Sequence, residues 1–245
     1  MSEAADTPEA LPAPPLQRVP RRVPRRRADP LTTDAIVDAA LRVLDSDGLD
    51  GLSMRRVADE LGASAASLYW HVGSKDGLLD LLLDRVIGEI QVPEPVPERW
   101  REQLKEVAIA TRATILAHRD IVRISIGRIP MGPNALRHTE RVLAILRSGG
   151  VPDELAVHGQ LLLLSVVNGF TMDETGQGGD PPPDMPPIDE IARQVRDYMA
   201  ALPPSAFPNL IAVADHFTVT DQDRRFELLV DIYVDGLAKR VRDAD

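Results

Sequence analysis

The side chains best suited to hydrogen bonding with a ligand gather between Ser64 and Lys75, in the run SAASLYWHVGSK. The run opens with small residues, which let a backbone approach a groove closely, and it closes with aromatic and polar residues. An aromatic ring with a polar tip, a lysine and the free N–H groups of a helix start all suit contact with phosphate. This run therefore predicts contact with a nucleic acid.

An aromatic pair at the end of a helix is more often part of a core than of a binding surface. Tyr69 and Trp70, however, point about 100° apart on a helix and cannot both enter one small core. Leu68 lies on another side of the same helix and is the better core anchor. We therefore expect at least one ring to face outward, although the pair taken alone leaves the core interpretation open.

Three short helices and a longer fourth are expected to position these residues. Apolar residues at helical spacing after Thr33 predict a first helix of about 14 residues, which Gly48 and Gly51 interrupt. The second helix begins behind Ser53 as its N-cap and ends at Gly62. A third helix covers residues 64–71 and a fourth covers residues 75–90.

A tight turn containing a glycine joins the second and third helices, and this arrangement predicts a helix-turn-helix. We expect phosphate contacts from Tyr69 and Lys75, and base contacts from Ser64, Ala65 and Ser67. The full set of expected DNA-contacting residues is Thr33, Ser53, Met54, Arg55, Ser64, Ala65, Ala66, Ser67, Tyr69, Trp70, His71 and Lys75.

Residues 31–90 resemble, without a gap, the DNA-binding domain of the tetracycline-repressor (TetR) family. The positions that fill the family's pattern are Gly48 or Gly51, Val57, Ala58, Gly62, Leu68, Tyr69, His71, Val72, Lys75 and Leu78. The resemblance implies an all-α protein with an N-terminal three-helix helix-turn-helix domain and a C-terminal helical domain for ligand binding and dimerisation. It also implies a transcriptional repressor that binds a palindromic DNA operator as a homodimer.

The formal net charge of −10 argues against a polyanionic partner, but the distribution of charge removes most of this objection. Residues 18–27 hold six arginines among prolines, a composition that forms neither a helix nor a core. From Leu31 to Lys75, four basic residues stand against seven acidic ones. We expect residues 1–30 to be a disordered arm. It is either a solvated tail or a segment that contacts DNA beside the reading helix.

Three prolines within residues 91–99 separate a DNA-binding unit over residues 31–90 from a second unit over residues 98–243. The second unit is expected to be almost all helix, with long helices over residues 100–118, 135–147, 153–174 and 222–242. Residues 175–187 form a loop rich in Gly and Pro. We favour a tolerated surface insertion over a gate for this loop.

Two of these helices are more apolar than a single chain of this size can cover. The helix that begins at Asp153 contains Leu161 to Leu164, which we expect to be buried on nearly every side. The last helix repeats the pattern with Phe226 and Leu229. Pairing of both helices with their symmetry mates would form a four-helix interface, and the TetR resemblance implies the same homodimer.

The resemblance continues into the C-terminal half, where it is less specific. The founding member of the family holds magnesium–tetracycline through His, Asn, Thr and Glu side chains. The matching positions here are Gln91, Val107, Ser125, Arg128 and a position near Gln177, and none keeps the family's residue. A magnesium site without an imidazole or a carboxylate is not expected. We therefore predict no metal, no cofactor and no response to tetracycline.

The composition predicts instead a cavity for a small, largely apolar effector, which would be anionic if Arg128 faces inward. The residues expected to line it are Val107, Thr111, Leu116, His118, Ile124, Ser125, Arg128, Val142, Asn168, Phe170 and Met172. The alternative is that these residues form a filled core. The protein would then be a ligand-independent DNA-binding protein of the same fold.

No catalytic motif of the zinc-protease, nucleophile-elbow or phosphate-loop kind occurs in the sequence, and there is no cysteine. The close pairs His118–Asp120 and Asp173–Glu174 do not share a helix face, so we expect them to be ion-pairing surface residues. No signal peptide or long uninterrupted apolar run is present. We expect a cytoplasmic protein without a membrane partner, which is not an enzyme. An enzyme with an incidental helix-turn-helix is the remaining alternative.

Overall fold

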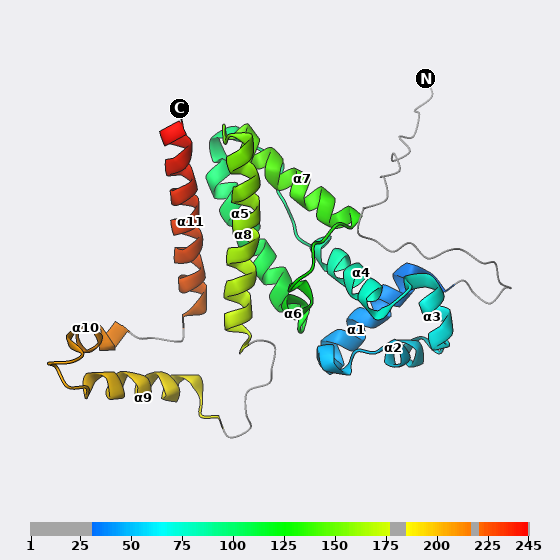
Figure 1. Ribbon diagram of the computed structural model, residues 1–245, viewed down its shortest axis with the longest axis horizontal. Helices are drawn as coiled ribbons and strands as arrows, with labels where there is room; N and C mark the ends of the chain where they lie inside the picture. Colours follow the sequence, from blue (N-terminus) through cyan, green and yellow to red (C-terminus); the bar gives the residue numbers. More distant parts are fainter. Residues whose placement is uncertain (1–30, 177–184, 217–220, 245) are drawn as a thin grey trace.

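The computed structural model describes residues 31–176, 185–216 and 221–244. Within these ranges the chain forms helices and no strand, so the predicted all-α fold is confirmed. Figure 1 shows α1 to α4 gathered at one end of the molecule, beside a body built from the long helices α5, α7, α8 and α11. The predicted arm, residues 1–30, and most of the predicted 175–187 loop lie outside the described residues.

The four N-terminal helices begin where the sequence predicts. Their bounds are Thr33–Gly51 for α1, Met54–Leu61 for α2, Ala65–Val72 for α3 and Lys75–Ile87 for α4. A serine caps each of the last three, since Ser53, Ser64 and Ser74 each accept a backbone N–H three residues later, at 3.0–3.2 Å. These bonds satisfy N–H groups that the helices themselves leave free.

Glycines end these helices as predicted, with one difference. Gly48 has φ 72° and kinks α1, and Gly62 takes the left-handed conformation (φ 60°) that ends α2. The predicted fourth helix reaches residue 90, but α4 ends at Ile87. Gly88 follows directly and is a poor helix former, and the chain then turns into the proline-containing segment before α5.

The C-terminal half starts with a short 3-10 turn, η1 (Pro97–Arg99), and its long helices match the predicted ones. The helices are α5 (Trp100–Ala117), α6 (Ile121–Ser125), α7 (Pro133–Ser148), α8 (Asp153–Glu174) and α11 (Gln222–Ala244). The short α6, of five residues, was not predicted as a helix. Two further helices had no counterpart in the prediction, α9 (Ile188–Ala200) and α10 (Pro208–Ala212). They pack against each other and a 3-10 turn, η3 (Ala214–His216), and extend away from the body in Figure 1. Prolines on both sides of α9 obscure its pattern in the sequence.

Two hydrophobic clusters hold the chain together. The first joins α1 to α4 around Leu44, Leu68 and Leu82, and it also contains Ile121 and Ile124 from α6. The second joins α5, α7, α8 and α11 through residues such as Leu104, Val142, Phe226 and Val234. Because α6 contributes to the N-terminal core, the unit formed by α1 to α4 and the C-terminal body share packed surface.

The prediction that Leu161 to Leu164 are buried on nearly every side is wrong for a single chain. Leu163 is buried, but the side of α8 that carries Leu161 and Leu162 is exposed, with 57% of Leu161 accessible. Among the described residues, α8 is the one helix long and apolar enough to cross a membrane, a test that core helices of soluble proteins also pass. Its outer face lacks a partner within the described part of the chain.

Candidate nucleic-acid interface and cavity

Helix α3 carries two aromatic side chains, Tyr69 and Trp70, on its outward-facing side; we call this pair the aromatic tip. Leu68 and Val72 are buried in the N-terminal core, whereas 48% of Tyr69 and 45% of Trp70 is exposed. Both rings face outward, where the sequence required only one. The edge of the Trp70 ring meets His71 with 4.7 Å between centroids. The outer side of α3 thus offers an indole, a phenol and an imidazole next to small residues.

The other predicted DNA-contacting residues are exposed or half-buried, with one exception. Ser53, Arg55, Ser64, Ala66 and Lys75 are exposed. Half-buried positions are Thr33, Ala65, Ser67 and His71. Met54 is a correction, because only 5% of it is exposed and it packs in the N-terminal core as the first residue of α2.

The cations of this unit differ in their availability for phosphate. Arg42 pairs with Glu60, and Arg56 pairs with Asp47 at 2.8 Å and with Glu60 at 3.2 Å. Arg55 and Lys75, by contrast, make no ion pair within the described residues. These two cations, on either side of α3 in sequence, are therefore the ones that an anionic ligand would meet without first breaking a pair.

The segment after α5 joins the C-terminal body to α1. Asp120 has a left-handed backbone (φ 58°), and its Oδ2 accepts the Leu49 N–H at 2.8 Å. It is buried, which corrects its prediction as a surface residue. His118 lies at the same contact between the segment after α5 and α1. Its ring nitrogens are 3.3 Å from the carboxylate of Asp45 and 3.0 Å from the carboxylate of Glu89. Burial lowers the pKa of His118, but the hydrogen bonds to the two carboxylates outweigh it and raise the pKa above its usual value.

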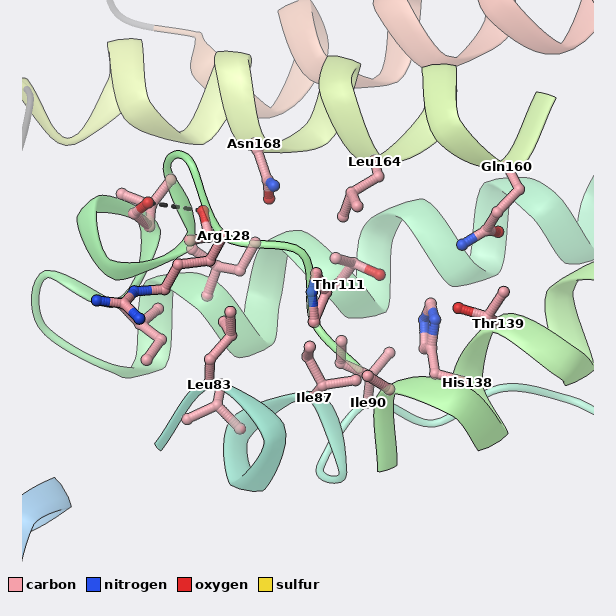
Figure 2. A pocket seen from close by; sticks show the side chains of 17 residues that line it. Leu83, Ile87, Ile90, Thr111, Arg128, His138, Thr139, Gln160, Leu164 and Asn168 are labelled. Carbon is pink, nitrogen blue, oxygen red and sulfur yellow. Dashed lines mark hydrogen bonds between the residues drawn. The ribbon is translucent and has the colours of Figure 1, made fainter. Parts of the chain in front are cut away.

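A cavity of about 100 Å³ lies between α4, α5, α6, α7 and α8. Four residues predicted to line a cavity do so: Thr111, Ser125, Arg128 and Asn168. Figure 2 shows Asn168, Leu164 and Gln160 entering from α8, with Leu83 and Ile87 of α4 on the opposite side. The lining is mostly apolar with a few polar groups, as in sites for small organic molecules.

The other residues predicted to line the cavity lie elsewhere. Val107 and Val142 are fully packed in the C-terminal core, and Phe170 packs against Phe226 with 5.1 Å between ring centroids. His118 belongs to the contact with α1, and Met172 lies near the C-terminal end of α8. Ile124 is part of the N-terminal core, and Leu116 is exposed. The apolar character of a residue does not by itself show whether its side chain lines the cavity or packs in the core.

Several lining residues were missed by the sequence analysis, above all His138. Its Nε2 is buried without a hydrogen-bond partner within the described residues, and burial lowers the pKa of the ring. An imidazole is therefore present, which corrects one part of the prediction against a magnesium–tetracycline site. Among the described residues, the lining includes no Asp or Glu. A detectable signal for the α4 side was the helical spacing of Leu83, Val86, Ile87 and Ile90.

Arg128 lines the cavity, but its guanidinium is directed toward α4. Nη2 lies 2.8 Å from Asp76 Oδ1, and Nη1 lies 2.6 Å from Asp80 Oδ1. Figure 2 shows this head pointing away from the labelled cavity residues. Two carboxylates already neutralise the charge that was expected to face an anionic ligand.

A capped helix-turn-helix with an exposed reading helix, attached to a helical body with a cavity, defines a class of DNA-binding regulators with a separate ligand-binding domain. Residues 36–82 match the model of the tetR family of bacterial regulatory proteins, and residues 92–241 match the tetracyclin repressor-like C-terminal domain. The chain belongs to the TetR family. It is a TetR-family transcriptional regulator, as the resemblance predicted.

Three similar proteins represent the family. ActR from Streptomyces coelicolor, solved in complex with actinorhodin, is 45% identical; the match covers 89% of this chain and all of that one, with a TM-score of 0.82. The tetracycline repressor class A from transposon 1721 of Escherichia coli is 32% identical over 86% of this chain and 92% of its own length. A regulator from Saccharopolyspora erythraea is 44% identical over 49% of this chain. The match covers about half of that relative's own length.

Proposed function

We propose that this protein is a cytoplasmic homodimeric repressor that binds a palindromic operator and is released by a small, largely apolar effector. The observation that carries the proposal is the position of the cavity. Leu83, Val86 and Ile87 of α4 form part of its wall, and α4 also packs in the core that holds the reading helix α3. A ligand in the cavity would therefore touch the helix that orients the reader.

For DNA recognition, we propose that α3 enters the major groove, as the second helix of a helix-turn-helix does. The exposed tip with Tyr69 and Trp70, and the cations Arg55 and Lys75, would contact the backbone. The small residues Ser64, Ala65, Ala66 and Ser67 would lie against base edges. Thr33, Ser53 and His71 are proposed as flanking contacts, and buried Met54 would act only by packing α2.

For dimerisation, we propose the outer faces of α8 and α11. Val157, Leu161 and Leu162 are exposed on α8, and Leu228 and Ile232 are exposed on α11, where 63% of Ile232 is accessible. Contiguous apolar surface of this kind marks a protein–protein contact. Two helices from each copy would form a four-helix interface with two-fold symmetry, which matches a palindrome.

For the effector, we propose an aromatic, largely apolar molecule with a polar group that hydrogen-bonds to His138, Gln160 or Asn168. The ligand of the solved ActR complex, actinorhodin, is the first probe to use. We propose no metal and no response to tetracycline, because the described residues that line the cavity supply no carboxylate. The effector must bind the conformer that fits DNA poorly, and by linkage DNA must then weaken effector binding by the same factor.

The test uses a genomic fragment selected by binding to the purified protein. Mobility shifts of this fragment are recorded while actinorhodin, or magnesium with tetracycline, is titrated into the complex. We expect release by the first at concentrations that raise the melting temperature of the free protein, and no release by the second. Release by tetracycline, or ligand binding without any loss of DNA affinity, would contradict the proposal.

A ligand-independent DNA-binding protein of the same fold is the second candidate, and the small volume of the cavity favours it. About 100 Å³ is well below the 300–1,000 Å³ of most ligand sites. A thermal-shift screen of aromatic molecules separates the two functions. No stabilisation by any compound, with operator binding intact, would support this second candidate.

A further inference from the structure

Three aspartates form a line along α4. Asp76, Asp80 and Asp84 follow one another at intervals of four residues, so they lie on one face of the helix. All three contact the same short piece of chain, residues 128–135, which connects α6 to α7 and enters α7. We call these three residues the acidic stripe.

The N-terminal part of the acidic stripe holds Arg128. Its guanidinium reaches Asp76 Oδ1 at 2.8 Å and Asp80 Oδ1 at 2.6 Å, and it also donates to the Asp76 carbonyl at 3.3 Å. The arginine side chain is mostly covered, whereas 82% of the Asp76 side chain is exposed. One cation thus bridges two successive turns of α4.

The last aspartate of the acidic stripe caps a helix of the other unit. Asp84 accepts the Ala135 N–H at 2.9 Å and the Asn134 N–H at 3.3 Å, while the Asn134 side chain donates to the Asp84 carbonyl at 3.1 Å. The N-cap of α7 is Gly132, which has no side chain to make this bond itself. A Cβ at Gly132 would meet the Asp84 carboxylate, so the glycine lets this carboxylate reach the helix start.

Such a cap is a strong contact between two elements. It satisfies two N–H groups that α7 leaves free, and it places a negative charge at the positive end of a helix. Asp84 is 9% exposed, so water offers little competition for these bonds. Movement of the α7 start relative to α4 therefore breaks charge-assisted hydrogen bonds in a covered site.

The cavity lies directly behind these contacts. Leu83 and Val86 lie beside Asp84 on α4 and line the cavity, and Arg128, Ala135 and His138 line the part of its wall that is bonded to α4. At about 100 Å³ the cavity is too small for most drug-sized ligands, which occupy 300–1,000 Å³. Such a ligand must displace a wall, and the wall made by residues 128–138 is bonded to α4 through the acidic stripe.

We propose that the acidic stripe is the clamp through which the cavity controls the DNA-binding unit. When the bonds of the acidic stripe to residues 128–135 are formed, the clamp is closed. It then holds α4 against the start of α7 in the orientation in which the DNA-binding unit fits the operator. An effector that enlarges the cavity pulls Arg128 and the α7 start away from α4 and frees the DNA-binding unit. This inference rests on the proposed function, and Asp84 acts in it as a positioning residue.

The test needs no effector, because operator binding must favour the closed clamp. Amide hydrogen exchange is measured for peptides that cover residues 130–139, with and without the selected palindromic fragment. In the wild-type chain the fragment should slow this exchange by at least about fivefold, the lower end of common coupling factors. Melting temperatures check that each variant is folded.

Asp84→Leu removes the cap, and we expect the fragment to slow exchange in it less than twofold. Asp76→Asn with Asp80→Asn releases Arg128 at more exposed positions, and it should reduce the slowing even if Asp84→Leu does not fold. Asp38→Asn is the matched control. It removes one carboxylate that pairs with Arg85 of α4 at 3.0 Å, away from the cavity wall, and should keep the full slowing.

Either of two results would overturn the clamp: no slowing in the wild-type chain on a fragment that it binds, or full slowing in both stripe variants. An equal decrease in Asp38→Asn would also overturn it, since α4 would then respond to the removal of any ion pair. Failure of the wild-type chain to bind any palindromic fragment would contradict the proposed function itself, and the clamp with it.

Discussion

His118 and His138 stand 20 positions apart in the chain, and their surroundings shift them in opposite directions. Two carboxylates from α1 and the end of the α4 segment face His118 and raise its pKa despite burial, whereas burial alone lowers the pKa of His138. His118 is therefore a cationic contact between the two units at mildly acidic pH. Burial favours the neutral form of His138, which lines the cavity and whose Nε2 has no hydrogen-bond partner within the described residues.

The first prediction concerns His118 and pH. Because its folded-state pKa is raised, its contribution to stability is fully present below the unfolded value of about 6.5 and is lost as pH rises through the folded value. We expect His118→Gln to lower stability at pH 5.5–6, with the difference from wild type shrinking toward pH 9. Urea unfolding of the variant and of the wild-type chain, repeated across this pH range, measures the difference in their free energies of unfolding. Taking the difference cancels the opposite effect of His138. A gap that is independent of pH would contradict the assignment.

The second prediction concerns Arg55 and Lys75, the cations of the N-terminal unit that make no ion pair within the described residues. Lys75→Ala and Arg55→Ala should weaken DNA binding to all sequences and lower the salt slope by about one for each phosphate that is no longer neutralised. Arg42→Ala is the matched control, because Arg42 is already paired with Glu60 and should change the slope less. Substitutions at Ser64, Ala65 or Ser67 should instead change which base pairs are preferred. If both groups of variants changed affinity uniformly, α3 would not be the reading helix.

At the scale of elements, the four N-terminal helices were predictable because each carries a local signal. Ser53, Ser64 and Ser74 are N-cap residues that mark the starts of helices. Gly48 and Gly62 mark the places where helices are interrupted or end. Each of these signals acts on backbone groups only a few residues away in the chain. They can therefore be recognised in the sequence without knowledge of the tertiary structure. Helix geometry likewise predicted that at least one of the rings of Tyr69 and Trp70 faces outward, and both do.

The candidate cavity was predictable only in part, because its walls come from helices distant in sequence. Val107 and Val142 have the same apolar character as lining residues, but they face the core of α5, α7, α8 and α11. His118 and Asp120 look like a local pair, yet each has a partner in α1 that lies more than 70 residues away. Which side of a helix meets a cavity depends on long-range packing, which no local spacing encodes.

The third prediction concerns the faces of α8 and α11. Leu161→Glu with Ile232→Glu places charges on the proposed interface, and we expect a monomer that binds the operator about a hundredfold more weakly. Leu136→Glu is the control, since Leu136 is an exposed apolar residue on α7 and should leave the dimer intact. Sedimentation and mobility shifts measure both properties. A stable dimer in the double variant would contradict this interface.

The whole chain is acidic, although its proposed partner, DNA, is a polyanion. The net charge is −10, and residues 31–75 hold four basic residues against seven acidic ones. Six arginines within residues 18–27 are the largest local source of positive charge in the sequence. The fourth prediction is that truncation before Asp29 lowers operator affinity and makes the salt slope shallower. Unchanged affinity at two salt concentrations would show that these residues are only a solvated tail.

We propose that two copies of α3 read one symmetric DNA site and that the C-terminal body controls this binding. The most direct measurement is a footprint of the purified protein on genomic fragments selected by binding, with the number of chains per fragment measured on the same complex. We predict a palindrome bound by an even number of chains, with half-sites centred about 34–36 Å apart along one face of the duplex. An asymmetric site bound by one chain, or no enriched sequence, would contradict the claim.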